Sequence, residues 1–244
     1  DAATGEEVWR HDPGVSEDWI PYTAACRGVA YHEQDGSGEE ICRERIIEGT
    51  LDGRLIAVDA GSGEPCPDFG TGGAADIKTG MGEVVPGMVS MTSPPVIVDG
   101  VIVTGHQVLD GQKRDAPSGV IKGFDVITGA HLWSWDMTRP DIARLPPEGE
   151  TFTRGTPNAW TIAAGDDALG LAYIPMGNSS VDYWSTGRSE AENTYATSLV
   201  ALDVRSGRPA WHFQTVRMDV WDYDLGSQPT LLDFPGPEGP VPAI

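Results

Sequence analysis

The feature that most constrains the fold is a short motif that returns four times along the chain. Segments of the pattern Asp-x-x-Ser/Thr-Gly begin at Asp1, Asp59, Asp125 and Asp203. We expect the Asp and Ser/Thr side chains to accept hydrogen bonds from the amides of a tight turn, and the glycine to take a positive φ. Extended segments precede the later copies and follow each glycine, so the repeating unit is predicted to be strand, turn, strand.

The repeat predicts an all-β chain built as a β-propeller of four-stranded antiparallel blades. One such sheet cannot bury both of its faces, and radial stacking of blades around a channel solves this problem. Trp9, Trp133 and Trp211 follow three of the turns and are expected to pack adjacent sheets against each other. The 31 glycines and 19 prolines fit a chain with many turns. We expect about four blades in residues 1–244, no internal domain boundary, and a larger ring of which this chain is about half.

The net charge argues against binding to nucleic acid or anionic lipid, and the short apolar segments argue against a membrane-spanning helix. The chain carries 16 Lys and Arg against 37 Asp and Glu, a formal net charge of −21, which repels nucleic acid and anionic lipid. The same excess of carboxylates suits a hard cation such as calcium or magnesium, although most carboxylates simply solvate a surface. No segment is apolar over the about 20 residues that a membrane helix needs. Cys26, Cys42 and Cys66 form no zinc or redox spacing, and their pairing stays open.

The repeat with its tryptophan resembles the tryptophan-docking motif of the eight-bladed quinoprotein dehydrogenases. Non-catalytic propellers carry similar repeats, so the resemblance depends on five segments outside the turns, which stand in the order of that family. They are Ala25-Cys26-Arg27-Gly28-Val29, Thr92-Ser93-Pro94-Pro95, Ser118-Gly119-Val120-Ile121, Pro175-Met176-Gly177-Asn178 and Asp219-Val220-Trp221-Asp222-Tyr223-Asp224. In these segments the chain is similar to the membrane-bound glucose dehydrogenase group, which includes quinate and polyol dehydrogenases. The resemblance implies a periplasmic protein that uses pyrroloquinoline quinone (PQQ) and Ca²⁺ or Mg²⁺.

The last of these segments holds the residue expected to be the catalytic base. In the family, the aspartate directly after this tryptophan takes the hydroxyl proton of the substrate, and the match falls on Asp222. Hydride transfer from an alcohol requires removal of that proton, and a carboxylate does this at neutral pH. Without the resemblance, the favoured explanation of Asp222 is an ordinary turn or rim residue.

Three residues match the cofactor contacts of the family. Trp160 matches the tryptophan that stacks flat under the tricyclic quinone, a task that suits a broad π face. Arg27 is expected to pair with a carboxylate of the cofactor, because a guanidinium fork suits that group, and Thr92 to add a hydroxyl hydrogen bond. Taken alone, Trp160 is a blade-packing residue, Arg27 a surface cation and Thr92 a strand residue.

The resemblance assigns the metal to Asp110, Asn178 and Asp222. A hard cation takes neutral amide oxygens alongside carboxylates, which suits Asn178. Asn178 also follows Trp160 at the spacing found in the family. Asp110 lies in a polar loop, where it and Asp115 are equally well explained as solvated side chains.

These matches imply oxidation of a sugar, cyclitol or polyol hydroxyl, with glucose as the first substrate to consider. Electrons are expected to pass to ubiquinone through a partner or membrane anchor outside this chain. The alternative is a non-catalytic periplasmic propeller that serves as a protein-binding scaffold. The chain departs from the glucose dehydrogenases at Thr23, Arg217 and Met218, where histidines are usual. The basic residue that the family places near the quinone falls beyond Ile244, so we expect this chain alone to be inactive; the oligomeric state stays open.

Overall fold

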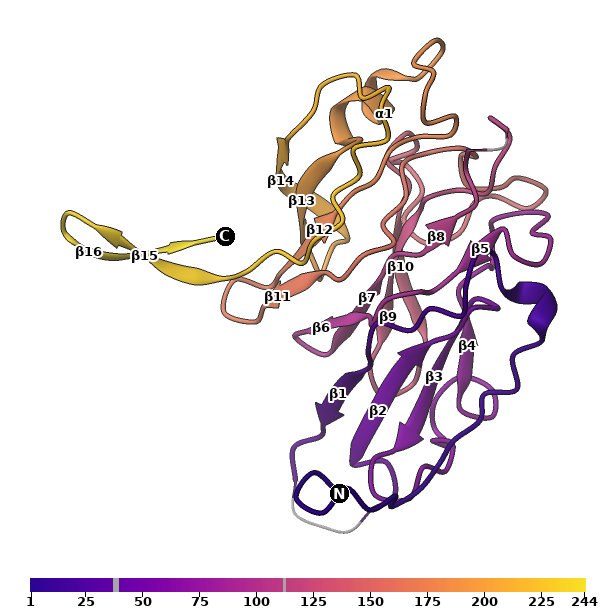
Figure 1. The fold of residues 1–244 in the computed structure, drawn as a ribbon, viewed down its shortest axis with the longest axis vertical. Helices are drawn as coiled ribbons and strands as arrows, with labels where there is room; N and C mark the ends of the chain where they lie inside the picture. The colour runs from indigo at the N-terminus through magenta and orange to yellow at the C-terminus, as the bar shows by residue number, and fades with distance from the viewer. Residues whose placement is uncertain (37–39, 112) are drawn as a thin grey trace.

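The chain forms three four-stranded sheets that follow one another along the sequence. The computed structural model describes residues 1–36, 40–111 and 113–244, and strands make up almost all of its regular structure. Figure 1 shows the three sheets side by side, and all pairings within them are antiparallel. The prediction of an all-β chain with four-stranded antiparallel blades is confirmed.

Within each sheet the strands lie side by side in sequence order. The first sheet contains β1 (Ala30–Glu33), β2 (Glu44–Gly49), β3 (Arg54–Asp59) and β4 (Ala74–Asp76). The second contains β6 (Val96–Val98), β7 (Val101–Thr104), β9 (Ile121–Asp125) and β10 (His131–Trp135). The third contains β11 (Ala164–Asp166), β12 (Leu171–Pro175), β13 (Ser198–Asp203) and β14 (Arg208–Gln214). A small ribbon pairs β5 (Val89–Ser90) with β8 (Gln107–Val108). The longest helix is α1 (Glu190–Tyr195), and within the described residues no helix is long and apolar enough to cross a bilayer.

The aspartate of each repeat closes its own turn, as predicted. Asp125 Oδ1 accepts hydrogen bonds from the amides of Ile127 and Thr128, at 3.2 and 2.7 Å, and from Thr128 Oγ1 at 2.7 Å. Gly129 then takes a φ of 66°, which a residue with a Cβ rarely adopts. Equivalent bonds are accepted by Asp1, Asp59 and Asp203.

The aromatic residue after three of the four turns docks on the turn of the following copy, whereas Trp211, after the fourth turn, is 39% exposed. Trp133 Nε1 donates a hydrogen bond to the carbonyl of Val204 at 2.6 Å, and its ring covers Gly207 so closely that a Cβ there would lie 2.4 Å away. Only glycine therefore fits beneath the ring. The same contact joins Trp9 to Gly63 and Phe69 to Gly129.

The repeat count predicted about four blades, whereas three complete sheets are present among the described residues. Residues 1–29 contain one 3₁₀ turn, Glu17–Trp19, and no strand, because no neighbouring strand pairs with their backbone. At the other end, β15 (Leu232–Gly236) and β16 (Gly239–Ala243) form a hairpin that extends away from the three sheets (Figure 1). The first repeat and the terminal hairpin therefore lie outside the complete sheets.

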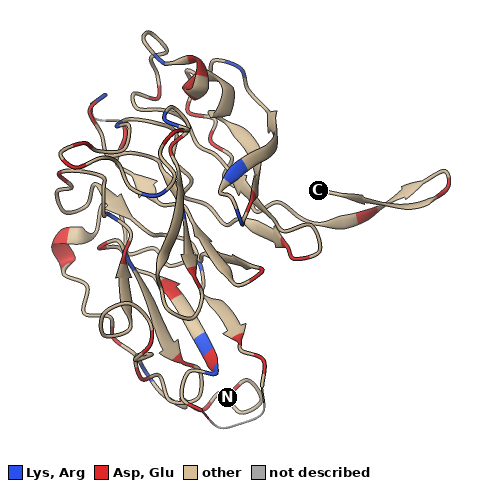
Figure 2. Cartoon of the chain, turned by 180° about the vertical axis from the view of Figure 1, so that it is seen from behind, with Lys and Arg blue, Asp and Glu red and all other residues tan. Residues whose placement is uncertain are grey.

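Apolar side chains fill the spaces between successive sheets. One buried cluster joins the first and second sheets and includes Ile47 and Phe124. A second cluster joins the second and third sheets and includes Trp133 and Ile174. The carboxylates, by contrast, lie mainly on loops and strand ends, with few Lys or Arg among them (Figure 2).

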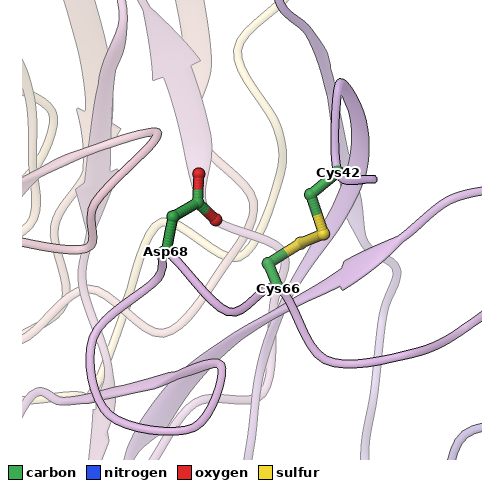
Figure 3. A group of neighbouring side chains, drawn as sticks. All are labelled: Cys42, Cys66 and Asp68. Carbon is green, nitrogen blue, oxygen red and sulfur yellow. A yellow bond between two sulfur atoms is a disulfide. The ribbon is translucent and has the colours of Figure 1, made fainter. Parts of the chain in front are cut away.

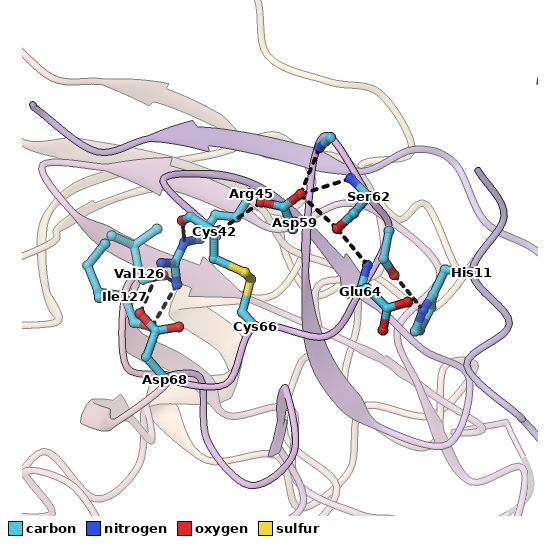
Figure 4. The surroundings of a disulfide bond; sticks show 12 residues. His11, Cys42, Arg45, Asp59, Ser62, Glu64, Cys66, Asp68, Val126 and Ile127 are labelled. Atoms are coloured by element: carbon cyan, nitrogen blue, oxygen red, sulfur yellow. Dashed lines mark hydrogen bonds and ion pairs between the residues drawn. A yellow bond between two sulfur atoms is a disulfide. The ribbon is translucent and has the colours of Figure 1, made fainter. Parts of the chain in front are cut away.

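A disulfide and a buried arginine fix the start of β2. The disulfide joins Cys42 to Cys66, with Cα atoms 5.7 Å apart, and leaves the third cysteine free and exposed. Figure 3 shows the two bonded sulfurs beside Asp68. Arg45 is fully buried; it donates to the carbonyl of Ile127 at 2.8 Å and pairs with Asp68 at 3.1 Å (Figure 4). These contacts tie the first sheet to the turn of the second and answer the pairing question that the sequence left open.

Candidate active site

A cavity of about 290 Å³ lies where four separate segments of the chain meet. These segments are the irregular stretch 21–27 before β1, the loop after β8, the loop before β11 and the loop after β14. Their side chains in the cavity include Arg27, Asp110, Trp160 and Asp222. The fold therefore brings together most of the site residues that the sequence predicted.

The loop after β14 presents Asp222 by means of a buried anchor. Asp219 is only 1% exposed, and its carboxylate accepts hydrogen bonds from the amides of Trp221 and Tyr223 at 2.9 and 2.8 Å. Thr197 Oγ1 donates a third bond to it at 2.8 Å. Asp222 takes a φ of 63°, a conformation that costs energy for a non-glycine residue and that these bonds hold in place. Its side chain is left exposed at the cavity.

Asp224 turns inward and fixes the ring of Trp160. Asp224 Oδ2 accepts a hydrogen bond from Trp160 Nε1 at 2.6 Å, and Oδ1 accepts one from the amide of Asn178 at 2.7 Å. A Cβ at Gly177 would lie 2.8 Å from Asp224 Oδ2, so the backbone approaches this carboxylate closely. Burial raises the pKa of Asp224, the bond from Trp160 opposes this, and the charge of Asp222 adds to it.

Thr92 holds Arg27 and Trp160 together on another side of the cavity. Thr92 Oγ1 and Ser93 Oγ donate hydrogen bonds to the carbonyl of Trp160 at 3.1 and 2.7 Å. The carbonyl of Thr92 accepts from the Arg27 amide at 3.2 Å and from Arg27 Nη1 at 3.0 Å. The guanidinium carbon lies 5.1 Å from the centroid of the Trp160 ring, a cation–π distance. Within the described residues Arg27 has no carboxylate partner, so its charge is available to an anion in the cavity.

Carboxylates crowd one side of the cavity without a basic partner. We use the term cavity wall for the lining residues Asp110, Asp222 and Asp224 together with Asn158 and Asp182, which lie behind them. Asp110 Oδ2 accepts a hydrogen bond from Asn158 Nδ2 at 2.5 Å, and burial together with the charge of Asp224 raises the pKa of Asp110 to about 6. Asp182 is 5% exposed, and burial followed by the charges of Asp110 and Asp222 raises its pKa to about 7. In the part of the chain that the structure describes, no Lys or Arg forms an ion pair with these carboxylates. The wall therefore favours a bound cation or protonation.

Asn178 lies directly behind this wall and is 1% exposed. Its Oδ1 accepts a hydrogen bond from the amide of Ser179 at 2.9 Å, and its Nδ2 donates to the carbonyls of Asp182 and Asp219 at 3.1 and 3.2 Å. The side chain thus joins the loop after β12 to the loop after β14. An amide oxygen has two lone pairs, so Oδ1 keeps one for a further partner.

Exposed aromatic side chains flank the predicted base. The hydroxyl of Tyr183 donates to Asp222 Oδ2 at 3.5 Å. Trp221 and Tyr223 stack on each other with ring centroids 5.9 Å apart. A substrate that approaches Asp222 therefore meets both a hydroxyl donor and flat apolar surface.

Sequence reasoning did not assign Asn158, Asp182 or Asp224 to the site. Asp224 stands inside a segment that the resemblance singled out, and Asn158 stands two residues before Trp160, so a signal for both was present. Asp182 had no such signal, because only the path of the loop after β12 brings it to the wall. There its Oδ2 would lie 3.4 Å from a Cβ placed on Gly111.

Ligand-bearing side chains gather more tightly at the disulfide than at the cavity. Within residues 1–36, 40–111 and 113–244, the one group of His, Cys, Asp or Glu ligand atoms that all lie within 4.8 Å is Cys42, Cys66 and Asp68. The two sulfurs are bonded to each other and Asp68 pairs with Arg45, so this group is not a metal site (Figure 3). Among the described residues, no three carboxylates of the cavity meet that spacing, so a cation there needs neutral oxygen ligands as well.

Known proteins are similar to this chain in sequence and in fold. Residues 1–244 match the family described as "PQQ: Glucose/ethanol/alcohol dehydrogenase, beta-propeller domain". The whole chain aligns with the glycerol dehydrogenase large subunit of Gluconobacter oxydans (strain 621H) at 54% identity and with the quinoprotein glucose dehydrogenase of Escherichia coli (strain K12) at 41%. It covers 33% and 31% of these two proteins, about a third of their length. The fold is similar to the quinohemoprotein alcohol dehydrogenase from Comamonas testosteroni, with a TM-score of 0.69 and 22% identity over 99% of this chain and 35% of that one.

Proposed function

Because the chain belongs to the family of PQQ-dependent glucose, ethanol and alcohol dehydrogenase β-propeller domains, we propose that the complete protein oxidises a hydroxyl group of a polyol, sugar or cyclitol. The higher identity to the glycerol dehydrogenase large subunit supports glycerol ahead of glucose as the substrate. The absence of the histidines usual in glucose dehydrogenases, at Thr23, Arg217 and Met218, favours a polyol as well. These relatives give no support to a non-catalytic scaffold.

The cavity fits a planar, anionic quinone. Trp160 is held at both its carbonyl and its Nε1, so its ring is a fixed flat surface. The guanidinium of Arg27 lies over that ring and suits a carboxylate of the cofactor, and Thr92 positions both residues. When bound, PQQ supplies the hydride acceptor and the divalent cation supplies a Lewis acid.

The opposite wall fits a hard divalent cation. Asp110, Asp222 and Asp224 line the cavity, and the buried Asn178 contacts Asp224 through its backbone amide. Aspartate and amide oxygens are the ligands that such cations prefer. We propose Ca²⁺ ahead of Mg²⁺, because calcium accepts many oxygen ligands in flexible geometry and this wall offers oxygens from several loops.

The presentation of Asp222 is the observation that carries this proposal. Asp219 and Asp224 are both pinned by hydrogen bonds, so the turn between them directs Asp222 to the same cavity as Trp160 and Arg27. A carboxylate in that place takes the proton of a substrate hydroxyl as hydride leaves the carbon.

The test is dye reduction by the complete protein, reconstituted with PQQ and Ca²⁺, with glycerol, sorbitol, glucose and quinate compared as substrates. We expect turnover that requires both PQQ and the cation, with glycerol or sorbitol oxidised faster than glucose. Turnover without PQQ would overturn the proposal. Failure to take up PQQ at micromolar concentration would also overturn it and would favour the protein-binding scaffold.

A further inference from the structure

Buried oxygens without partners gather behind the cavity. Asn158 Oδ1, Ser179 Oγ, Ser180 Oγ and Asp182 Oδ1 are all buried, and among the described residues none of them has a hydrogen-bond partner. Their residues are no more than 5% exposed. Buried polar atoms in folded proteins are almost always paired, so each exception calls for a ligand that would satisfy it. Here the unpaired oxygens belong to two adjacent stretches of chain.

These oxygens adjoin Asp110. The same amide that leaves Asn158 Oδ1 unpaired donates through Nδ2 to Asp110 Oδ2 at 2.5 Å. Asp182 reaches the next residue of that loop, since its Oδ2 would lie 3.4 Å from a Cβ on Gly111. A backbone bond of 2.7 Å, from the Gly177 amide to the Asn158 carbonyl, keeps the two stretches together. Asp110, Asn158 and Asp182 thus come from three segments of the chain that contact one another.

The charges at this place favour a cation. Asp182 is surrounded by the charges of Asp110, Asp222 and Asp224. Arg188 is close by, but its Nη2 donates to the backbone carbonyl of Asp182 at 3.1 Å and not to the carboxylate. A buried carboxylate without a partner destabilises the fold, and a divalent ion with oxygen ligands removes that cost.

We propose that Asp182 and Asn158, together with Asp110, hold the divalent cation, with Asp182 Oδ1 and Asn158 Oδ1 as direct ligands. The proposal rests on the proposed function for the identity of the site and adds two residues to its ligand set. Asn178 then offers a further amide oxygen, while Asp222 stays at the cavity as the base. The hydroxyls of Ser179 and Ser180 offer further neutral oxygens to the same ion.

The first test is Ca²⁺ binding to the complete protein, purified without PQQ and measured by isothermal titration calorimetry. Asp182→Asn is expected to weaken the affinity by at least about tenfold, because a neutral amide replaces a charged ligand. Asn158→Asp keeps an oxygen at the same place and is expected to retain binding. Asp18→Asn is the matched control, since Asp18 is exposed on the 3₁₀ turn, and its affinity is expected to equal that of the wild type.

Thermal melting separates a cation ligand from a structural carboxylate. Without Ca²⁺, Asp182→Asn is expected to raise the melting temperature, because it removes a buried, unpaired charge. With Ca²⁺ the wild type gains stability and the variant does not. Wild-type affinity in Asp182→Asn, or a lower melting temperature in both conditions, would overturn the inference. Loss of Ca²⁺ binding in Asp182→Asn alongside absent turnover in the wild type would refute the proposed function alone.

Discussion

The blade turns and the cavity wall use the same residue types in opposite ways. At the turns, aspartates such as Asp125 accept the amides that the turn leaves free, and a glycine takes the positive φ. At the wall, Asp182 and Asn158 each keep a buried oxygen without a partner among the described residues, and Asp222 itself takes the positive φ. At the turns the polar groups are paired within the folded chain. The cavity wall instead keeps buried oxygens without partners and a strained φ at Asp222, which is typical of sites that bind a ligand or carry out a reaction.

Removing the exposed carboxylate of the wall is expected to have the largest effect of all on activity. Asp222→Asn keeps the shape of the side chain but cannot accept a proton, so kcat should fall by about 10²- to 10⁴-fold. Stability should change little, because the side chain is exposed. Dye reduction and PQQ titration by tryptophan fluorescence measure the two effects separately. A variant that binds PQQ and keeps kcat within a few-fold of the wild type would show that Asp222 is not the base.

The largest effect on the free energy of unfolding is expected for a tryptophan that packs one blade against the next. Trp133 is 5% exposed and joins two blades, so Trp133→Ala should lower the free energy of unfolding by about 3–5 kcal/mol. Trp184→Ala is the matched control, since Trp184 is 64% exposed at the rim, and its cost should stay within about 0.5 kcal/mol. Urea unfolding of the complete protein measures both. Similar losses in the two variants would contradict the docking role.

Two glycines with the same backbone conformation allow the cost of a positive φ to be measured separately from the cost of displacing the Trp133 ring. Gly207 has a φ of 66° and lies under the Trp133 ring, whereas Gly170 has a φ of 64° with nothing within 4 Å of the position that a Cβ would take. Gly170→Ala should cost about 1 kcal/mol through the unfavourable φ alone. Gly207→Ala should cost about 2–4 kcal/mol, because the ring must also move. Equal losses in urea unfolding would mean that the ring adjusts freely and that docking is loose.

The two regions also differ in how far the sequence predicted them. Each turn is built from neighbours in sequence, so the pattern that begins at Asp125 specifies both its hydrogen bonds and its glycine. The docking of Trp133 was predicted as packing between sheets, although its partner Gly207 was not named. Of the four predicted repeats, three turns lie in complete sheets, and the turn that begins at Asp1 lies outside them.

The site was predictable only where a motif marked it. Asp222, Trp160 and Arg27 meet in one cavity, and each was found through a segment that resembles a known family. Asp182 is placed by the path of a loop and by contacts between distant segments, which no local pattern records. For the same reason the sequence left the Cys42–Cys66 pairing open, since it depends on how β2 and the loop after β3 meet.

Lys122 is the place where the blade interior resembles the cavity wall, because it is a buried ionisable group that forms no ion pair within the described residues. Its Nζ donates to the carbonyls of Ile77 and Thr79 at 2.7 and 2.6 Å, and burial lowers its pKa to about 7. The unfolded chain keeps this proton up to about pH 10.4, so above pH 7 the unfolded state binds more protons than the folded state. Stability should therefore rise with pH between 7 and about 10, by at most about 1.4 kcal/mol per pH unit, and the slope from Lys122 vanishes well below pH 7, where both states are protonated.

The measurement that sharpens this contrast is urea unfolding at pH 7 and at pH 9 for the wild type, Lys122→Met and Lys113→Met. Lys113 is exposed, so its variant should keep the pH slope of the wild type. Lys122→Met should have a smaller slope, because its side chain cannot titrate in either state. Parallel slopes in all three proteins would show that Lys122 stays charged inside the blade. In that case its carbonyl partners and the ring of Phe152, 4.9 Å from Nζ, stabilise the ammonium ion as well as a carboxylate would.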